Sequence, residues 1–255
     1  MITIYDFECP APGFKTMSPY VLKVRIALNY KKLPHRSVFV KASELKQVSE
    51  ELGLPTNDLD LDDPPRHKVP IIHDASTGQF VSDSTRILAY LDKTYPQTPS
   101  ILTPGTEAAA VAFDDAVLAN MLHPLYPSIG ARFTRSLDAE KTAGYRGFME
   151  KMIGMTIEEY LANPELEEKH LKSAEEGFGV VNTIFKKAEM IQGAGAEGNG
   201  RNLTFADVSA GSILLYIRVC WWDNEANWKR LMAWDGGRWA RLYETLLPYA
   251  VVPEQ

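Results

Sequence analysis

The sequence predicts an α/β plus all-α protein, with a small α/β domain at residues 1–97 and an all-helical domain at 104–255. Within residues 2–95, short apolar runs of strand character alternate with segments of helical spacing in the order β-α-β-α-β-β-α. After Pro96 and Pro99, convincing strand patterns stop and only helical periodicity continues. This change in pattern near residues 96–103 predicts the domain boundary.

The N-terminal elements follow from local patterns. Residues 2–7 alternate in the manner of a short strand. Ser18 and Pro19 then begin a helical segment, because serine is a preferred N-cap and proline suits the first helical turn. Residues 37–40 predict a second strand, and residues 41–66 predict a short helix followed by an irregular acidic insert.

A β-hairpin and a third helix complete this part. Apolar residues at 68–72 and 80–81 flank a polar turn at 73–78, which predicts two paired strands. The next helix begins within 82–84 and ends at Tyr95 and Pro96.

The helical half predicts five helices, separated by loops that include the glycine-rich stretch 193–200. Their expected ranges are 105–135, 138–162, 165–191, 204–219 and 235–247. The segment 121–127 breaks the first of them at its two prolines. Thr204 and Asp207 have the spacing of a capping box, which we interpret as structural.

Composition limits the function. The chain has 255 residues and a net charge of −6, without a basic patch, which argues against nucleic acid or an anionic membrane as partner. It begins without a secretory pattern and has no long apolar run, so a cytoplasmic location is expected. The two cysteines, Cys9 and Cys220, lie far apart and support neither a disulfide framework nor a metal site.

Three short motifs are candidates for chemistry, and each has an ordinary structural explanation. Ser18 before Pro19 and Asp83 before Ser84 are both typical helix caps. Val69 before Pro70 is typical of a chain entering a strand. None of the three motifs predicts a function by itself.

Together and in this order, the motifs resemble the glutathione transferase family. The segments that carry the resemblance are SPYVLKVRIALNYKKLPH, KVPII and SDSTRILAYLDKTYP, and the similarity spans nearly the whole chain. The serine-type group is most similar, including fungal etherase-related transferases and bacterial lignin β-etherases. The resemblance implies a thioredoxin-like N-terminal domain, glutathione as co-substrate and a homodimer.

The resemblance also implies roles for individual residues. Val69 would pair with the glutathione backbone across a cis peptide bond at Pro70, and Asp83 and Ser84 would hold the γ-glutamyl end at a helix N-terminus. Lys68 would reach the glycine carboxylate, although a solvated lysine is an equal alternative.

Ser18 would activate the glutathione thiol by donating a hydrogen bond to the sulfur, and Tyr5 is the second choice for this role. Relatives with cysteine at the Ser18 position carry out thiol–disulfide chemistry, so serine indicates attack of the thiolate on a carbon atom. Cys9 lies outside that position and is interpreted as an incidental small residue.

The acceptor substrate would bind between the domains, where aromatic and sulfur-containing side chains suit a bulky aromatic ligand. The alternative is that segment 121–127 is only a kinked core helix, and His123 is an ordinary histidine. The predicted acceptor site consists of Phe7, Phe14, Lys15, Met121, Leu122, Leu125 and Tyr126.

Three hypotheses follow for the whole chain. The first is a transferase that attacks small hydrophobic or aromatic electrophiles, with ether cleavage as one option. The second is a ligandin-type protein that binds aromatic or phenolic compounds with little turnover. The third is a scaffold domain that uses the same fold, and the intact set of motifs argues against it.

Overall fold

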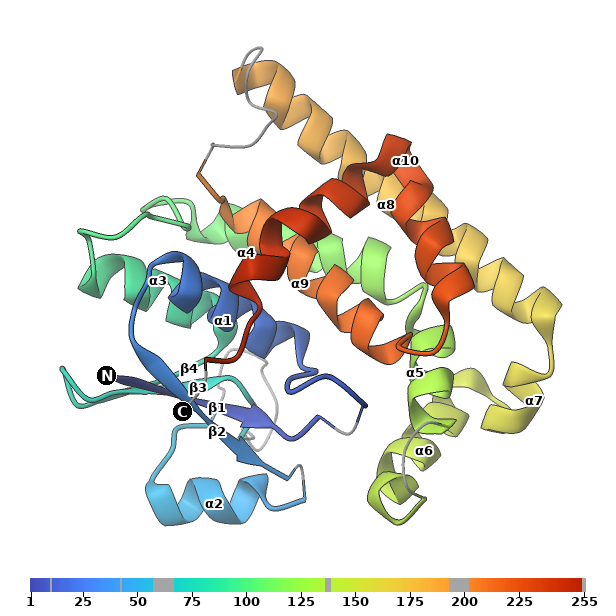
Figure 1. Cartoon of the computed structure of the whole chain (residues 1–255), viewed down its shortest axis with the longest axis horizontal. Helices are drawn as coiled ribbons and strands as arrows, with labels where there is room; N and C mark the ends of the chain where they lie inside the picture. Colours follow the sequence, from blue (N-terminus) through green and yellow to red (C-terminus); the bar gives the residue numbers. More distant parts are fainter. Residues whose placement is uncertain (10, 42, 57–66, 136–138, 193–201, 254–255) are drawn as a thin grey trace.

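The computed structural model describes residues 1–255 except 10, 42, 57–66, 136–138, 193–201 and 254–255. A four-stranded sheet with its helices forms one side of the molecule, and a larger group of helices forms the other (Figure 1). The predicted α/β plus all-α class is therefore confirmed. The acidic part of the predicted insert, within 57–66, and the glycine-rich stretch 193–200 lie outside the described residues.

The N-terminal elements occur in the predicted order. Strands β1 and β2 are parallel, whereas β1 pairs antiparallel with β3 and β3 with β4, which gives the sheet order β2-β1-β3-β4. The elements are β1 (Ile2–Phe7), α1 (Pro19–Tyr30), β2 (His35–Val40), α2 (Leu45–Leu52), β3 (Ile71–Asp74), β4 (Gln79–Ser82) and α3 (Ser84–Thr94).

Both faces of the sheet are covered. Ile2 and Ile4 of β1 belong to the main core together with apolar residues of α1 and α3. Tyr5 points to the other face, where it packs with Leu54 and Ile71. Helix α2 lies on that second side (Figure 1). Because both faces are covered, β1 is buried at nearly every position instead of only at alternate ones.

The helical half has more elements than the sequence predicts. The described helices are α4 (Glu107–Val117), the π-helical η1 (Leu118–Leu122), α5 (Tyr126–Arg135), α6 (Ala139–Ile153), α7 (Ile157–Leu161), α8 (Pro164–Gln192), α9 (Phe205–Cys220), α10 (Glu225–Leu246) and the short 3-10 helix η2 (Leu247–Tyr249). Among the described helices, none combines the length and apolar character that a membrane span requires.

Three of the predicted helix ranges were wrong in extent. The range 105–135 is divided into α4, η1 and α5, and the range 138–162 is divided into α6 and α7. The predicted start of the last helix at 235 was also wrong, because α10 begins at Glu225 behind an Asn224 cap. It is interrupted at Trp234 to Gly237, where Asp235 has φ 53°. Asp235 holds this break by accepting hydrogen bonds from Asn182 and Trp239, each at 2.7 Å.

The two halves share one continuous core. Helix α9 packs against α1, and apolar side chains of both halves belong to the same cluster. The predicted capping box at the start of α9 is confirmed, since Thr204 and Asp207 exchange both of its hydrogen bonds. The C-terminal tail returns to the first half (Figure 1), where the Asn29 amide donates to the carbonyls of Tyr249 and Val251 at 2.7 and 2.9 Å.

Candidate functional site

A cleft of about 520 Å³ lies where α3 faces the first helix of the helical half. Val111 and Leu118 form part of its wall on the helical side, and Leu102 lines it from the connection between the halves. The five residues predicted to bind glutathione all line this cleft, although they come from two separate stretches of sequence. They are Lys68, Val69, Pro70, Asp83 and Ser84.

Ser18 occupies the N-cap of α1. Its Oγ accepts a hydrogen bond from the Val21 N–H at 3.4 Å, and its carbonyl accepts one from the Leu22 N–H at 2.9 Å. Because the backbone N–H is the donor to Oγ, the Ser18 hydroxyl proton can be donated elsewhere. Ser18 is 9% exposed and does not line the cleft itself, but Tyr20, two residues later, does.

The Val69–Pro70 peptide bond is cis, as the resemblance implies. Both residues are buried and lie directly before β3, whose first paired residue is Ile71. The Val69 backbone therefore lies just before the first paired residue of β3, at the end of this inner strand that borders the cleft.

Asp83 and Ser84 form the N-terminus of α3. The Asp83 side chain accepts a hydrogen bond from the Arg86 N–H at 2.9 Å, so it is an N-cap as its local sequence predicts. Asp83 also has φ 79°, a conformation that costs a non-glycine residue free energy and is often found at functional sites. Ser84 is the first residue of the helix, where backbone N–H groups attract an anion.

Asp114 is a cleft residue that sequence reasoning missed. It accepts hydrogen bonds from Lys23 of α1, from Thr85 of α3 at 3.3 Å and from Ser209 of α9, and the Lys23 contact is also an ion pair. No local signal marks Asp114, because its partners lie 29 to 95 residues away. It joins both halves of the molecule at the cleft.

The charge of the cleft is mixed. Four carboxylates line it, together with Lys68 and Arg86, and the carboxylates are those of Asp83, Glu107, Asp114 and Asp115. A ligand that carries both an ammonium group and carboxylates is better matched to this surface than a simple anion. Among the described residues, no group of three or more His, Cys, Asp or Glu side chains is arranged to hold a metal ion.

The residues predicted for the acceptor site do not line this cleft, and they fall into two sets. Phe7, Phe14 and Tyr126 are half-buried at the edge of the core, and Lys15 is exposed. The other three side chains are buried in the core, namely Met121, Leu122 and Leu125.

Two other groups of the N-terminal half, the Cys9 thiol and the Tyr5 phenol, lie in surroundings that disfavour their ionised forms. Burial raises the pKa of the Cys9 thiol to about 11, so little thiolate forms near neutral pH. Burial also raises the pKa of Tyr5, and this side chain lies on the sheet face opposite the one that α1 covers. Neither group shares the N-cap position of Ser18.

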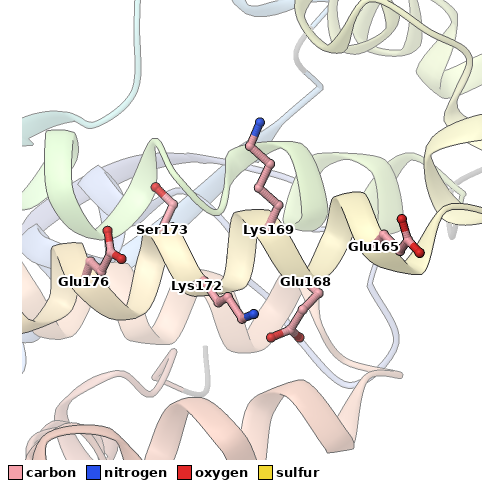
Figure 2. A pocket seen from close by; sticks show the side chains of 6 residues that line it. All are labelled: Glu165, Glu168, Lys169, Lys172, Ser173 and Glu176. Atoms are coloured by element: carbon pink, nitrogen blue, oxygen red, sulfur yellow. The ribbon is translucent and has the colours of Figure 1, made fainter.

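A second hollow runs along the outer surface of α8 (Figure 2). It is lined by one helix alone, and its side chains point outward on different sides of that helix without converging. None of the predicted site residues lines this hollow. We interpret it as the space between charged side chains on a solvated helix surface. The lining residues are Glu165, Glu168, Lys169, Lys172, Ser173 and Glu176.

A sheet of the thioredoxin type followed by a helical domain, with a cleft between them, defines the class of protein. Two family models match the chain: the glutathione S-transferase N-terminal domain over residues 17–94 and the glutathione S-transferase C-terminal domain over 108–249. The chain therefore belongs to the glutathione S-transferase family.

Solved structures of fungal proteins are similar over the full length. A glutathione S-transferase of Ceriporiopsis subvermispora, in complex with glutathione, is 29% identical with a TM-score of 0.82, covering 100% of this chain and 99% of that one. The glutathione transferase FuA3 of Phanerochaete chrysosporium is 28% identical with a TM-score of 0.83, covering 99% and 98%. A search of curated proteins gives no match.

Proposed function

We propose that this protein is a glutathione transferase in which Ser18 stabilises the thiolate of bound glutathione. The observation that carries the proposal is the convergence of Lys68, Val69, Pro70, Asp83 and Ser84 in one cleft beside the helix that Ser18 caps. The similar structure from Ceriporiopsis subvermispora that contains glutathione supports the same choice of co-substrate.

The cleft chemistry matches the three parts of glutathione. The γ-glutamyl carboxylate would accept hydrogen bonds at the N-terminus of α3, where Ser84 begins the helix and the helix dipole favours an anion. Asp83 would meet the γ-glutamyl ammonium group, and the Val69 backbone would pair with the central cysteine. Lys68 lies in the same cleft and would attract the glycine carboxylate.

Ser18 would supply the differential stabilisation that a thiolate needs. Lowering the pKa of a thiol by about two units requires roughly 2.7 kcal/mol. The Ser18 hydroxyl keeps its proton for an outside acceptor, and the first N–H groups of α1 add a favourable dipole. The thiolate would then attack a carbon atom of a small hydrophobic or aromatic electrophile. Cleavage of an aryl ether is one reaction of this kind.

The test separates activation from binding by comparing two serine variants. Ser18→Ala should raise the pKa of bound glutathione, followed by the ultraviolet absorbance of the thiolate, and should lower kcat/KM by about 10- to 100-fold. Ser84→Ala should weaken glutathione binding and leave the thiol pKa of the bound molecule unchanged. If Ser18→Ala changes neither the thiol pKa nor the rate, Ser18 is not the activating residue.

Binding of aromatic ligands without turnover is a second candidate function. Half-buried aromatic side chains of both halves pack against the shared core, including Phe7, Phe14, Tyr126 and Trp222. Quenching of tryptophan fluorescence by phenolic compounds, without a glutathione-dependent product, would favour this role. We further propose that the protein is a cytoplasmic homodimer. Analytical sedimentation would measure the mass of the assembly.

A further inference from the structure

The wall that α4 contributes to the cleft carries side chains to which the proposed binding of glutathione gives no role. Glu107, Val111 and Asp115 are spaced four residues apart, so they lie one above another on the same face of α4. All three line the cleft and all three are exposed. Leu118 continues this face by a further turn and is half-buried. The wall is therefore an apolar surface with a carboxylate on each side of Val111.

The two carboxylates of this wall differ from the other two in the cleft. Asp83 caps α3 and is assigned to the γ-glutamyl ammonium group, and Asp114 is paired with Lys23. Within the part of the chain that the structure describes, Glu107 and Asp115 have no ion-pair partner. Glu107 accepts a hydrogen bond from a backbone N–H at 3.2 Å, which leaves its charge in place. Both charges are therefore available to a ligand.

The basic side chains of the cleft do not cancel these charges. Lys68 would be occupied by the glycine carboxylate of glutathione, and Arg86 lies on α3 without an ion pair to either carboxylate of the α4 wall. Carboxylates outnumber basic side chains among the residues that line the cleft. Glutathione adds a net negative charge, because it has two carboxylates and one ammonium group, and the thiolate adds another. An acceptor substrate thus meets a negative electrostatic potential beside an apolar surface.

We propose that the cleft selects acceptor substrates that are amphipathic cations, with an apolar body against Val111 and a positive group beside Glu107 or Asp115. Four residues of helix rise by about 6 Å, so a positive charge about one helical turn from an aromatic ring reaches either carboxylate. Anionic electrophiles are disfavoured, because like charges are then placed near one another. This inference rests on the proposed transferase function and names the charge class of its acceptor.

The selection acts on binding and leaves the chemical step as proposed. With an aryl chloride, the thiol proton passes to water when the thiolate forms, and the sulfur then bonds to the ring carbon. The C–Cl bond breaks, and chloride leaves with the electron pair. Because the positive group of the substrate takes no part in these bond changes, Glu107 and Asp115 determine specificity and are not catalytic residues.

The experiment compares three amides of 4-chloro-3,5-dinitrobenzoic acid that share one reacting ring. The N-(2-trimethylammonioethyl) amide is the cation, the N-(3,3-dimethylbutyl) amide is its uncharged isostere, and the N-(2-sulfonatoethyl) amide is the anion. With the full-length protein and glutathione, kcat/KM for the cation should exceed that for the isostere by about 3- to 10-fold. The anion should react more slowly than the isostere by a similar factor.

Two double variants locate the origin of this preference. Glu107→Gln with Asp115→Asn should reduce the ratio of kcat/KM between the cation and the isostere to below about 2. Glu165→Gln with Glu176→Gln is the matched control, because it removes the same total charge from exposed carboxylates of α8 outside the cleft. The control should keep the original ratio. Raising the salt concentration from about 0.1 to 1 M shortens the screening length from about 10 to 3 Å and should also reduce the ratio.

Three outcomes overturn the inference. The first is an equal kcat/KM for the cation and its isostere in the unaltered protein, and the second is a preference that the α4 double variant keeps. The third is an equal loss of preference in the α8 double variant, which would assign the effect to the overall charge of the protein.

Failure of the proposed function gives a different result. Ser18→Ala should slow all three amides together and leave the ratios between them unchanged. If the protein shows no glutathione-dependent turnover at all, titration calorimetry with the same amides measures the preference as a ratio of affinities. Tighter binding of the cation, lost in the α4 double variant, would then support the inference without the transferase reaction, and equal affinities would overturn it.

Discussion

The ion pair between Asp6 and Arg25 is buried beneath the helix that Ser18 begins, and removing one partner is expected to be costly. Arg25 Nη2 lies 3.0 Å from Asp6 Oδ2, and Arg25 Nη1 donates to Ser37 Oγ at 2.8 Å. Both charged side chains are completely buried, and Arg25 Nε has no partner. The pair links β1, α1 and β2 around a single guanidinium group.

The expected magnitude follows from this burial. Burial raises the pKa of Asp6 and lowers that of Arg25, so each group would be neutral more easily here than in water. Asp6→Leu leaves an uncompensated guanidinium and should lower the free energy of unfolding by about 3–5 kcal/mol. At roughly 2–4 °C per kcal/mol for a chain of this size, Tm should fall by about 6–20 °C.

A double variant distinguishes loss of a favourable pair from creation of an unpaired charge. Asp6→Leu with Arg25→Met replaces both charges by apolar groups and should recover most of the lost stability, to within about 1–2 kcal/mol of the original. Urea unfolding followed by circular dichroism measures both variants. A cost below about 1 kcal/mol for Asp6→Leu, or a double variant no more stable than the single one, would refute the reasoning.

Two further predictions concern the helical half. Gly177→Ala should destabilise the protein by about 1–3 kcal/mol or more, because its Cβ would lie 2.0 Å from the backbone carbonyl oxygen of Asn120. Gly179→Ala on the same helix is the control: its Cβ meets nothing within 4 Å, so it should stabilise the protein by up to about 1 kcal/mol. Thermal unfolding measures both variants. Burial alone would raise the pKa of Glu167, but Arg132, which donates to it at 2.9 and 2.8 Å, lowers that pKa below the ordinary value of 4.5. The ionised Glu167 carboxylate therefore stabilises the folded protein above pH 4.5, and this contribution is lost as the pH falls and the carboxylate is protonated. The loss of stability caused by Glu167→Gln should accordingly become smaller on acidification. A loss that stays constant from pH 3 to 7 would contradict this.

Features that depend on a few neighbouring residues were predicted correctly from the sequence. The Ser18 cap, the Asp83 cap and the Thr204–Asp207 capping box all occur where the local pattern places them. Each depends on a side chain meeting a backbone N–H three residues further on, which the sequence fixes once a helix forms. The catalytic role of Ser18 stays a prediction.

The helical break at residues 118–126 shows where local reasoning reached its limit. The two prolines correctly indicate an interruption, but the sequence leaves open whether the apolar residues there face a pocket or the core. The structure winds Leu118–Leu122 as a π-helix and packs it against α8, where Gly177 approaches Asn120. This packing buries Met121, Leu122 and Leu125.

The sequence by itself determined the order of the elements, the helix caps and the separation into a sheet domain and a helical domain, because periodicity and capping act over a few residues. Only the tertiary structure decided which distant polar groups meet. Asp114 reaches Lys23 across 91 residues and Ser209 across 95. The physical reason is that such contacts depend on how closely whole helices pack. Glycines such as Gly177 permit a close approach of two helices, and no local pattern encodes which helix will approach.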